Sequence, residues 1–247
     1  MTLSGPRTFA VLTCCACIFA VFACAPLRPR QVTSVPVSRV KAAREALDVQ
    51  AKMVRSFITT GRMVIIDTAQ RIPATFLCVA TRSPFRIKTE ITHSWGLPLV
   101  NILVKGKQVI INDLYHKRTY NAQLGISGSI AGNLPALDRS VLWSIMRAYP
   151  EVMHRGSLSW SDTEQAFVLL SRGKREQIIY LDREGKFPSI VLYPELGLQV
   201  KFSDFKVMRQ FIYADHIEVT HSEKGSNMQI AIKKIIFNQE IDPEVFK

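Results

Sequence analysis

Residues 85–122 read FRIKTEITHSWGLPLVNILVKGKQVIINDLYHKRTYNA, and this stretch decides the fold class. From Phe85 to Ile91, apolar or small residues alternate with Arg, Lys and Glu. A period of two is typical of a strand with one buried and one solvated face. Lys105-Gly106-Lys107 then joins two further apolar runs and predicts a tight hairpin. The stretch therefore predicts consecutive antiparallel strands.

The same pattern continues on both sides of this stretch. Amphipathic helices are expected at 38–57, with Ser38 as N-cap, and at 134–149. Several strands carry runs that are apolar on both faces, so the sheet must curve around something. We expect a mainly β fold: an open antiparallel half-barrel of about eleven or twelve strands with helices as a lid over a hydrophobic cavity. The predicted strands are 58–67, 71–81, 84–92, 99–104, 108–114, 157–161, 166–172, 177–182, 189–193, 198–205, 212–220 and 229–237.

The N-terminus has the pattern of an export signal. Arg7 precedes an apolar run at 9–23, which is too short to span a bilayer comfortably. Val21-Phe22-Ala23-Cys24 resembles a bacterial lipobox, which predicts cleavage before Cys24 and its acylation. A plain signal peptide is the alternative, because further cysteines lie in the same run. The expected organisation is a signal peptide at 1–23, the acylated Cys24 and a tether at 24–37, and one domain at 38–247.

Composition excludes several function classes. The net charge is +12, but an exported protein rarely meets nucleic acid, and the charges are scattered rather than clustered. They predict a solvated surface or, alternatively, a weak attraction to anionic lipids or an acidic partner. Cys78 is the one cysteine beyond residue 24 and is expected in the core. HExxH, CxxC, P-loop and GxGxxG motifs are absent from the mature sequence, so we expect no enzyme, no metal and no cofactor.

The order of these features resembles a known family. In this order the chain resembles the LolA/LolB-like lipoprotein-localisation family. The features that carry the resemblance are the lipobox, a proline-containing tether, a helix, the strand block at 85–122, the Leu-Pro-Ala-Leu insertion at 134–137, a second strand block and the closing IDPEVF at 241–246. The resemblance implies an open barrel whose helices cover a hydrophobic cavity. With its lipid anchor the chain looks most like the LolB branch, the outer-membrane lipoprotein receptors.

That resemblance also implies a function and partners. The chain would sit in the outer membrane by its lipid anchor, facing the periplasm, since Ala25 resembles an outer-membrane sorting signal. It would accept acylated lipoproteins from a LolA-like periplasmic carrier and help insert them, as a monomer. The expected acyl-chain cavity comprises Phe76, Phe85, Ile87, Ile91, Leu103, Ile111, Leu142, Trp143, Ile145 and Met146. The alternative is a structural or assembly lipoprotein that uses the same fold to bind an envelope protein partner.

One turn carries a specific expectation. In LolB-like proteins a short turn after a strand presents a protruding leucine, and Trp95 takes that place here. Ser94 stands where that family has proline, and Pro98 follows two residues after Gly96. Tryptophan favours the membrane interface, so Trp95 is the candidate membrane-inserting tip. The alternative is that Trp95 folds back as a plug under the sheet edge.

Overall fold

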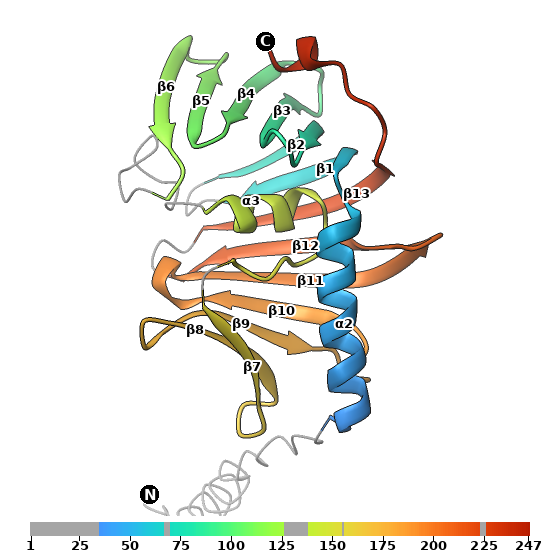
Figure 1. Cartoon of the computed structure of the whole chain (residues 1–247). Coiled ribbons are helices and arrows are strands. Elements are labelled where there is room, and N and C mark those ends of the chain that lie inside the picture. Colours follow the sequence, from blue (N-terminus) through green and yellow to red (C-terminus); the bar gives the residue numbers. More distant parts are fainter. Residues whose placement is uncertain (1–34, 67–69, 126–137, 155, 223–225) are drawn as a thin grey trace, which may run out of the picture. The chain divides into compact units, whose positions relative to one another are not determined.

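The computed structural model describes residues 35–66, 70–125, 138–154, 156–222 and 226–247. Cys24 and nearly all of the tether therefore lie outside the described residues. The described chain forms one antiparallel sheet of thirteen strands, in the order β6-β5-β4-β3-β2-β1-β13-β12-β11-β10-β9-β8-β7 (Figure 1). Because β6 and β7 are its two free edges, the sheet is open. The predicted mainly β, unclosed architecture is confirmed.

The strands of the first half are β1 (Ser56–Ile66), β2 (Arg71–Thr81), β3 (Arg86–His93), β4 (Pro98–Lys105), β5 (Gln108–Asp113) and β6 (Arg118–Gln123). Those of the second half are β7 (Ser157–Ser161), β8 (Ala166–Ser171), β9 (Lys174–Leu181), β10 (Pro188–Tyr193), β11 (Leu198–Met208), β12 (Phe211–His221) and β13 (Asn227–Phe237). One short 3-10 turn, η1 (Pro194–Leu196), lies between β10 and β11, and another, η2 (Pro243–Phe246), follows β13. The sequence pattern missed β6, an edge strand whose residues are mostly polar.

Two helices lie on one face of the sheet, which we call the inner face (Figure 1). The first, α2 (Val37–Met53), starts one residue before the predicted N-cap and ends earlier than expected. It buries Ala43, Leu47 and Gln50. The second, α3 (Arg139–Met146), begins where the Asp138 carboxylate accepts a hydrogen bond from Ser140 N at 2.8 Å. It is shorter than predicted, and the predicted residues 134–137 lie outside the described part of the chain.

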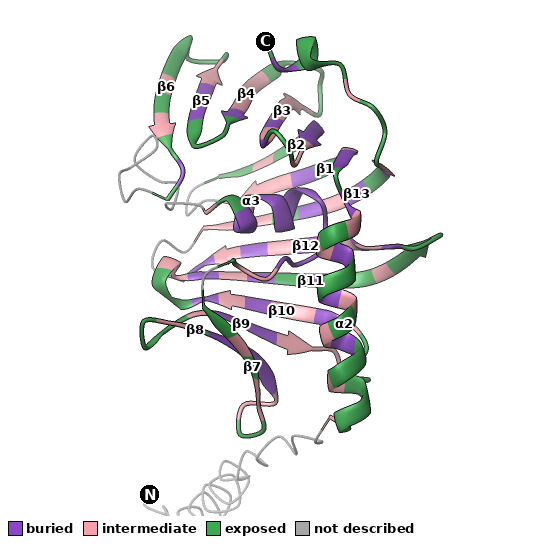
Figure 2. Ribbon diagram, in the orientation of Figure 1, coloured by how far each residue is buried: buried purple, intermediate pink, exposed green. Residues whose placement is uncertain are grey.

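A bulge in β13, opposite Gly61 of β1, contributes to the curvature of the sheet. Thr60 pairs with Lys234 and Gly61 with Ile232, so Lys233 is the extra residue, and bulges bend the strand that carries them. No side chain fits at Gly61, because a Cβ there would lie 2.3 Å from Ala231 O and 2.7 Å from the Phe76 ring. The Phe76 ring therefore lies against the inner face of β1. Apolar side chains of both helices and of this face form one core, and most of α3 is buried (Figure 2).

Candidate functional site

The strand register brings most of the predicted sheet residues together. Phe76 pairs with Ile91, Ile102 pairs with Ile111, and Ile87 pairs with Val104. Directly paired residues share a face, and these all belong to, or pack against, the core beneath the helices. Phe85, in the turn before β3, joins the same core. The apolar inner face was therefore correctly located from the alternation of the strands.

Leu103 is the exception, and its predicted inward position is wrong. It pairs with Lys88 in β3 and Ile110 in β5, so it lies on the outer face. Its neighbours Ile102 and Val104 face inward instead. The cause is that β4 is apolar on both faces, so alternation alone did not fix which side points inward. Asn101, two residues from Leu103 and on the same face, was the signal that could have decided it.

The four predicted lid residues lie on α3 and point into the core. Trp143, Ile145 and Met146 are buried, and Leu142 is half-buried. The Trp143 ring packs edge-on against Phe57, with 4.8 Å between ring centroids, and lies 5.9 Å from Phe85. In this conformation the space between α3 and the sheet is therefore filled by the protein's own side chains.

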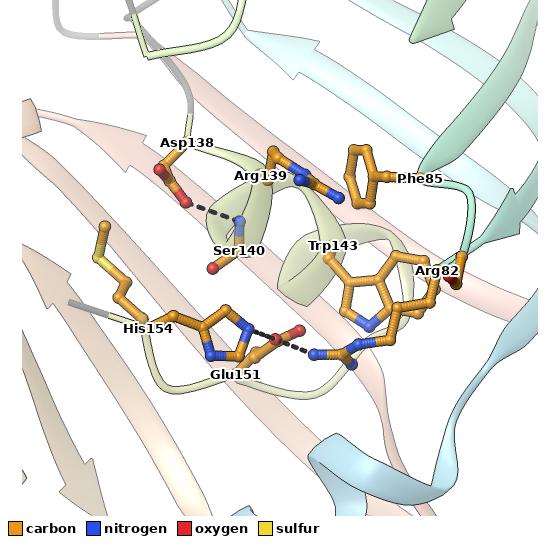
Figure 3. Close-up of a pocket in the computed structure, with 10 residues that line it drawn as sticks. Arg82, Phe85, Asp138, Arg139, Ser140, Trp143, Glu151 and His154 are labelled. Atoms are coloured by element: carbon orange, nitrogen blue, oxygen red, sulfur yellow. Dashed lines mark hydrogen bonds and ion pairs between the residues drawn. The ribbon is translucent and has the colours of Figure 1, made fainter. Parts of the chain in front are cut away.

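An open pocket of about 490 Å³ lies at the margin of this lid (Figure 3). Its size falls within the range of small-ligand sites, about 300–1,000 Å³. Of the predicted cavity residues, Phe85 and Trp143 line it. The Arg139 guanidinium stacks on Phe85 with 4.2 Å between its carbon and the ring centroid. The remaining lining is largely polar or charged: Arg82, Ser83, Asp138, Ser140, Glu151, Met153 and His154.

A buried carboxylate organises the floor of this pocket. Glu151 is 3% exposed, and it pairs with Arg82 and with His154 Nε2 at 3.1 Å. Its backbone is fixed as well, because Glu151 N donates to Ser144 Oγ at 2.8 Å and its carbonyl accepts from Gln177 Nε2 at 2.9 Å. These contacts tie the segment after α3 to the turn after β2 and to β9. The sequence pattern did not identify this network.

The same lid contains buried donors with no acceptor. Arg147 is 0% exposed, and its Nε and Nη1 have no hydrogen-bond partner, nor does Trp143 Nε1. Arg147 Nη2 has a long bond of 3.3 Å to Gln50 Oε1. Burial away from water lowers the Arg147 pKa to about 10, so the side chain is still charged at neutral pH. Unmet buried donors destabilise the state that contains them.

The Trp95 side chain projects into solvent. It is 90% exposed, which excludes the plug under the sheet edge in this conformation. The turn is well defined, since Gly96 N donates to His93 O at 2.8 Å and Gly96 has a φ of 87°. The Trp95 ring leans edge-on against the His93 ring, with 4.8 Å between their centroids.

Other predicted features are placed as follows. Cys78 is buried, and burial raises its thiol pKa to about 12, despite a hydrogen bond with Thr89 that lowers it. Such a thiol is protonated and unreactive.

The described residues contain no group of three or more His, Cys, Asp or Glu side chains that could hold a metal. In the same part of the chain, every helix is too short or too polar to cross a bilayer.

No protein-family model and no curated protein matches the sequence. Solved structures do match. One is a candidate outer-membrane lipoprotein-sorting protein domain from Vibrio parahaemolyticus (TM-score 0.54, 13% identity, covering 84% of this chain and 95% of that one). Another is a LolA superfamily protein from Nitrosomonas europaea (TM-score 0.52, 10% identity, 83% and 97%). The domain has a LolA-like fold.

A third match extends this likeness beyond proteins named for lipoprotein sorting. It is a DUF1329 family protein from Desulfovibrio piger, with a TM-score of 0.54 and 11% identity, covering 87% of this chain and 98% of that one. At such identities the likeness shows the fold and not the activity. What the LolA-like domain binds must be argued from its own inner face, lid and turns.

Proposed function

We propose that this chain is a non-enzymatic, outer-membrane lipoprotein of the LolB kind. Anchored by an acylated Cys24 and facing the periplasm, it accepts acylated lipoproteins from a LolA-like carrier. It binds their acyl chains on its inner face and helps insert them into the membrane through Trp95. The lipobox and Ala25 support the anchor and the compartment. The LolA-like fold supports the mode of binding.

One observation carries the proposal: an apolar sheet face is covered by two helices, and one of them, α3, has only eight residues. Acyl chains need apolar area more than fixed polar groups. The inner face offers it through Phe76, Ile91, Ile102 and Ile111, which belong to or pack against the same core as α3. If α3 moves away, an acyl chain occupies the space that the side chains of Ile145 and Met146 fill, and its methylene groups are chemically similar to theirs. Burial of apolar surface is then conserved.

The contacts of α3 in its closed position favour its movement away from the sheet. Its unmet donors on Trp143 and Arg147 gain water or ligand carbonyl partners when α3 lifts, which offsets part of the lost packing. The segment after α3 is held by hydrogen bonds such as Ala214 N to Ala148 O at 2.7 Å and Gln177 Nε2 to Glu151 O at 2.9 Å, so a movement of α3 must keep or break these bonds. The 490 Å³ pocket beside Trp143 gives an acyl chain a place to enter.

The test uses two adjacent residues of β4 as a matched pair. Ile102 faces inward and Leu103 outward, and both are half-buried. A benzophenone amino acid is placed at each position, and the protein is irradiated with a peptide carrying a triacylated cysteine. We expect cross-links from position 102 and none from 103, with the non-acylated peptide inactive at both. Equal yields at the two positions, or none at either, contradict binding on the inner face.

A second function is favoured by one specific observation. Trp143 is 1% exposed and packed against Phe57, so the space beneath the lid is occupied rather than empty. A permanently filled core fits a structural or assembly lipoprotein that binds an envelope protein partner. In that case the cross-linking fails at position 102, and native mass spectrometry of the purified full-length protein finds no acylated ligand.

A further inference from the structure

Trp95 is one of four large apolar side chains exposed on two hairpin turns. In the β3–β4 turn, Trp95 is 90% and Leu97 51% exposed. In the β5–β6 turn, Leu114 is 40% and Tyr115 63% exposed. Exposed aromatic and leucine side chains that gather at one place mark interaction sites, whereas single ones need no explanation.

The register places the two turns side by side. β4 is hydrogen-bonded to both β3 and β5, with Val100 paired to Ile91 on one side and to Asp113 on the other. Leu114 N also donates to Leu99 O at 2.9 Å, just where β4 begins. Both turns therefore leave the sheet at the same end (Figure 1). They are two strand spacings apart, which is about 10 Å.

The two turns are built alike. In each, a histidine ring packs edge-on against the exposed aromatic ring: His93 against Trp95 at 4.8 Å and His116 against Tyr115 at 4.9 Å. The second turn is held by Asp113, whose carboxylate accepts from His116 N at 2.9 Å and lies 2.8 Å from His116 Nδ1. Exposure of both aromatic rings is thus a feature of ordered turns.

Cations accompany the second turn. Lys117 and Arg118 directly follow Tyr115 and His116, and both are exposed. Neither has an ion-pair partner among the described residues, whereas the neighbouring Asp113 is already engaged with His116. Tryptophan and tyrosine favour the interface of a bilayer, and Lys and Arg beside them favour anionic head groups. This combination fits a phospholipid surface.

We propose that the Leu114–Tyr115 turn is a second membrane contact, acting together with Trp95 on an anionic bilayer surface. This inference rests on the proposed function and deepens it. A single tip lets an anchored protein pivot about one point. Two ordered tips about 10 Å apart restrict that rotation and hold the β3–β6 end of the sheet against the head groups. Released acyl chains then leave the inner face close to the bilayer.

The experiment compares lipid cross-linking at three exposed positions of the full-length, lipid-anchored protein in phosphatidylglycerol–phosphatidylethanolamine vesicles. A benzophenone amino acid replaces Tyr115, Trp95 or Val207. Val207 is the matched control, because it is 61% exposed and near another hairpin turn, β11–β12, at the opposite end of the strands. Phospholipid adducts are identified by mass spectrometry. We expect adducts from positions 95 and 115 and at least several-fold fewer from 207.

Each other result overturns the inference in a recognisable way. Adducts at 95 but not at 115 remove the second contact and leave the proposed function intact. Similar yields at 115 and 207 mean that anchoring alone brings any exposed residue to lipid. Adducts of 115 with protein instead of lipid identify a partner surface. Failure of acyl cross-linking at position 102 contradicts the proposed function and is a separate result.

The role of the cations is tested by Lys117→Gln. This substitution should lower the adduct yield at 115 on anionic vesicles by up to about fivefold, and leave the yield unchanged on phosphatidylcholine.

Discussion

Replacing Arg147 by methionine should stabilise the protein, although it removes a charged side chain from the centre of the domain. Arg147 is fully buried, and two of its donor atoms have no acceptor. Each unmet buried polar group costs about 1–3 kcal/mol. Methionine keeps a long, flexible apolar stem and removes that cost.

The losses are smaller than the gain. The bond from Arg147 Nη2 to Gln50 Oε1 is 3.3 Å long and contributes about 0.5–1.5 kcal/mol at most. Gln50 Oε1 remains satisfied, because it also accepts from Ile212 N at 3.1 Å. The guanidinium also lies 5.0 Å from the Tyr149 ring centroid, a contact of up to about 2 kcal/mol when desolvated. The expected net stabilisation is about 1–2 kcal/mol.

Urea unfolding followed by circular dichroism measures this difference in the free energy of unfolding. In thermal unfolding, each kcal/mol of stabilisation should raise Tm by about 2–4 °C for a domain of this size. The control is Arg183→Met in the exposed β9–β10 turn, which should change stability by less than about 0.5 kcal/mol. A stiffer lid should also slow uptake of the acylated peptide. A destabilisation of 1 kcal/mol or more by Arg147→Met would refute the reasoning, since it would mean that Arg147 has strong partners in the folded state.

Four further outcomes are expected. Trp95→Glu should change stability by less than about 0.5 kcal/mol but impair lipoprotein delivery to membranes, whereas Trp95→Leu should keep most of it; unfolding by Trp95→Glu would show that the ring is structural. Gly61→Ala should cost about 1–3 kcal/mol in urea unfolding, because its Cβ meets a backbone carbonyl at 2.3 Å; a neutral effect would mean that the bulge can relax. Cys78 should resist alkylation at pH 8 until the protein unfolds, since its pKa is about 12, and rapid labelling of native protein would contradict its burial. Cys24→Ala should give an uncleaved or mislocalised precursor, and normal processing with membrane retention would remove the lipoprotein assignment.

What the sequence predicted well depends on local pattern. Alternation along a strand shows which residues share a face, so the inner positions of β2, β3 and β5 were found without the structure. A glycine-containing turn gave the β4–β5 hairpin, where Gly106 has positive φ. β4 shows the limit of this reasoning, because a strand that is apolar on both faces has no alternation to fix its orientation. β6 shows another, since a polar edge strand resembles a loop in sequence.

What the sequence missed depends on contacts between distant segments. Arg147 and Gln50 are 97 residues apart, and Arg82 and Glu151 are 69 apart. No spacing rule connects them, and each alone resembles an ordinary surface residue. The second turn was overlooked for a related reason. Tyr115 stands in a polar context in the sequence, and its proximity to Trp95 follows only from the pairing of β4 with β5.

The filled inner face and the proposed acyl-chain binding are compatible because of what the lid contributes. An empty apolar cavity beneath α3 would be costly, since exposed or unpacked apolar surface destabilises the folded state. Ile145, Met146 and Trp143 remove that cost by occupying the space until a ligand arrives. An incoming acyl chain gains only the difference between its own burial and that of the displaced side chains. On the proposed function, binding is therefore moderate in strength, which suits a protein that must release its cargo to a membrane without an energy source.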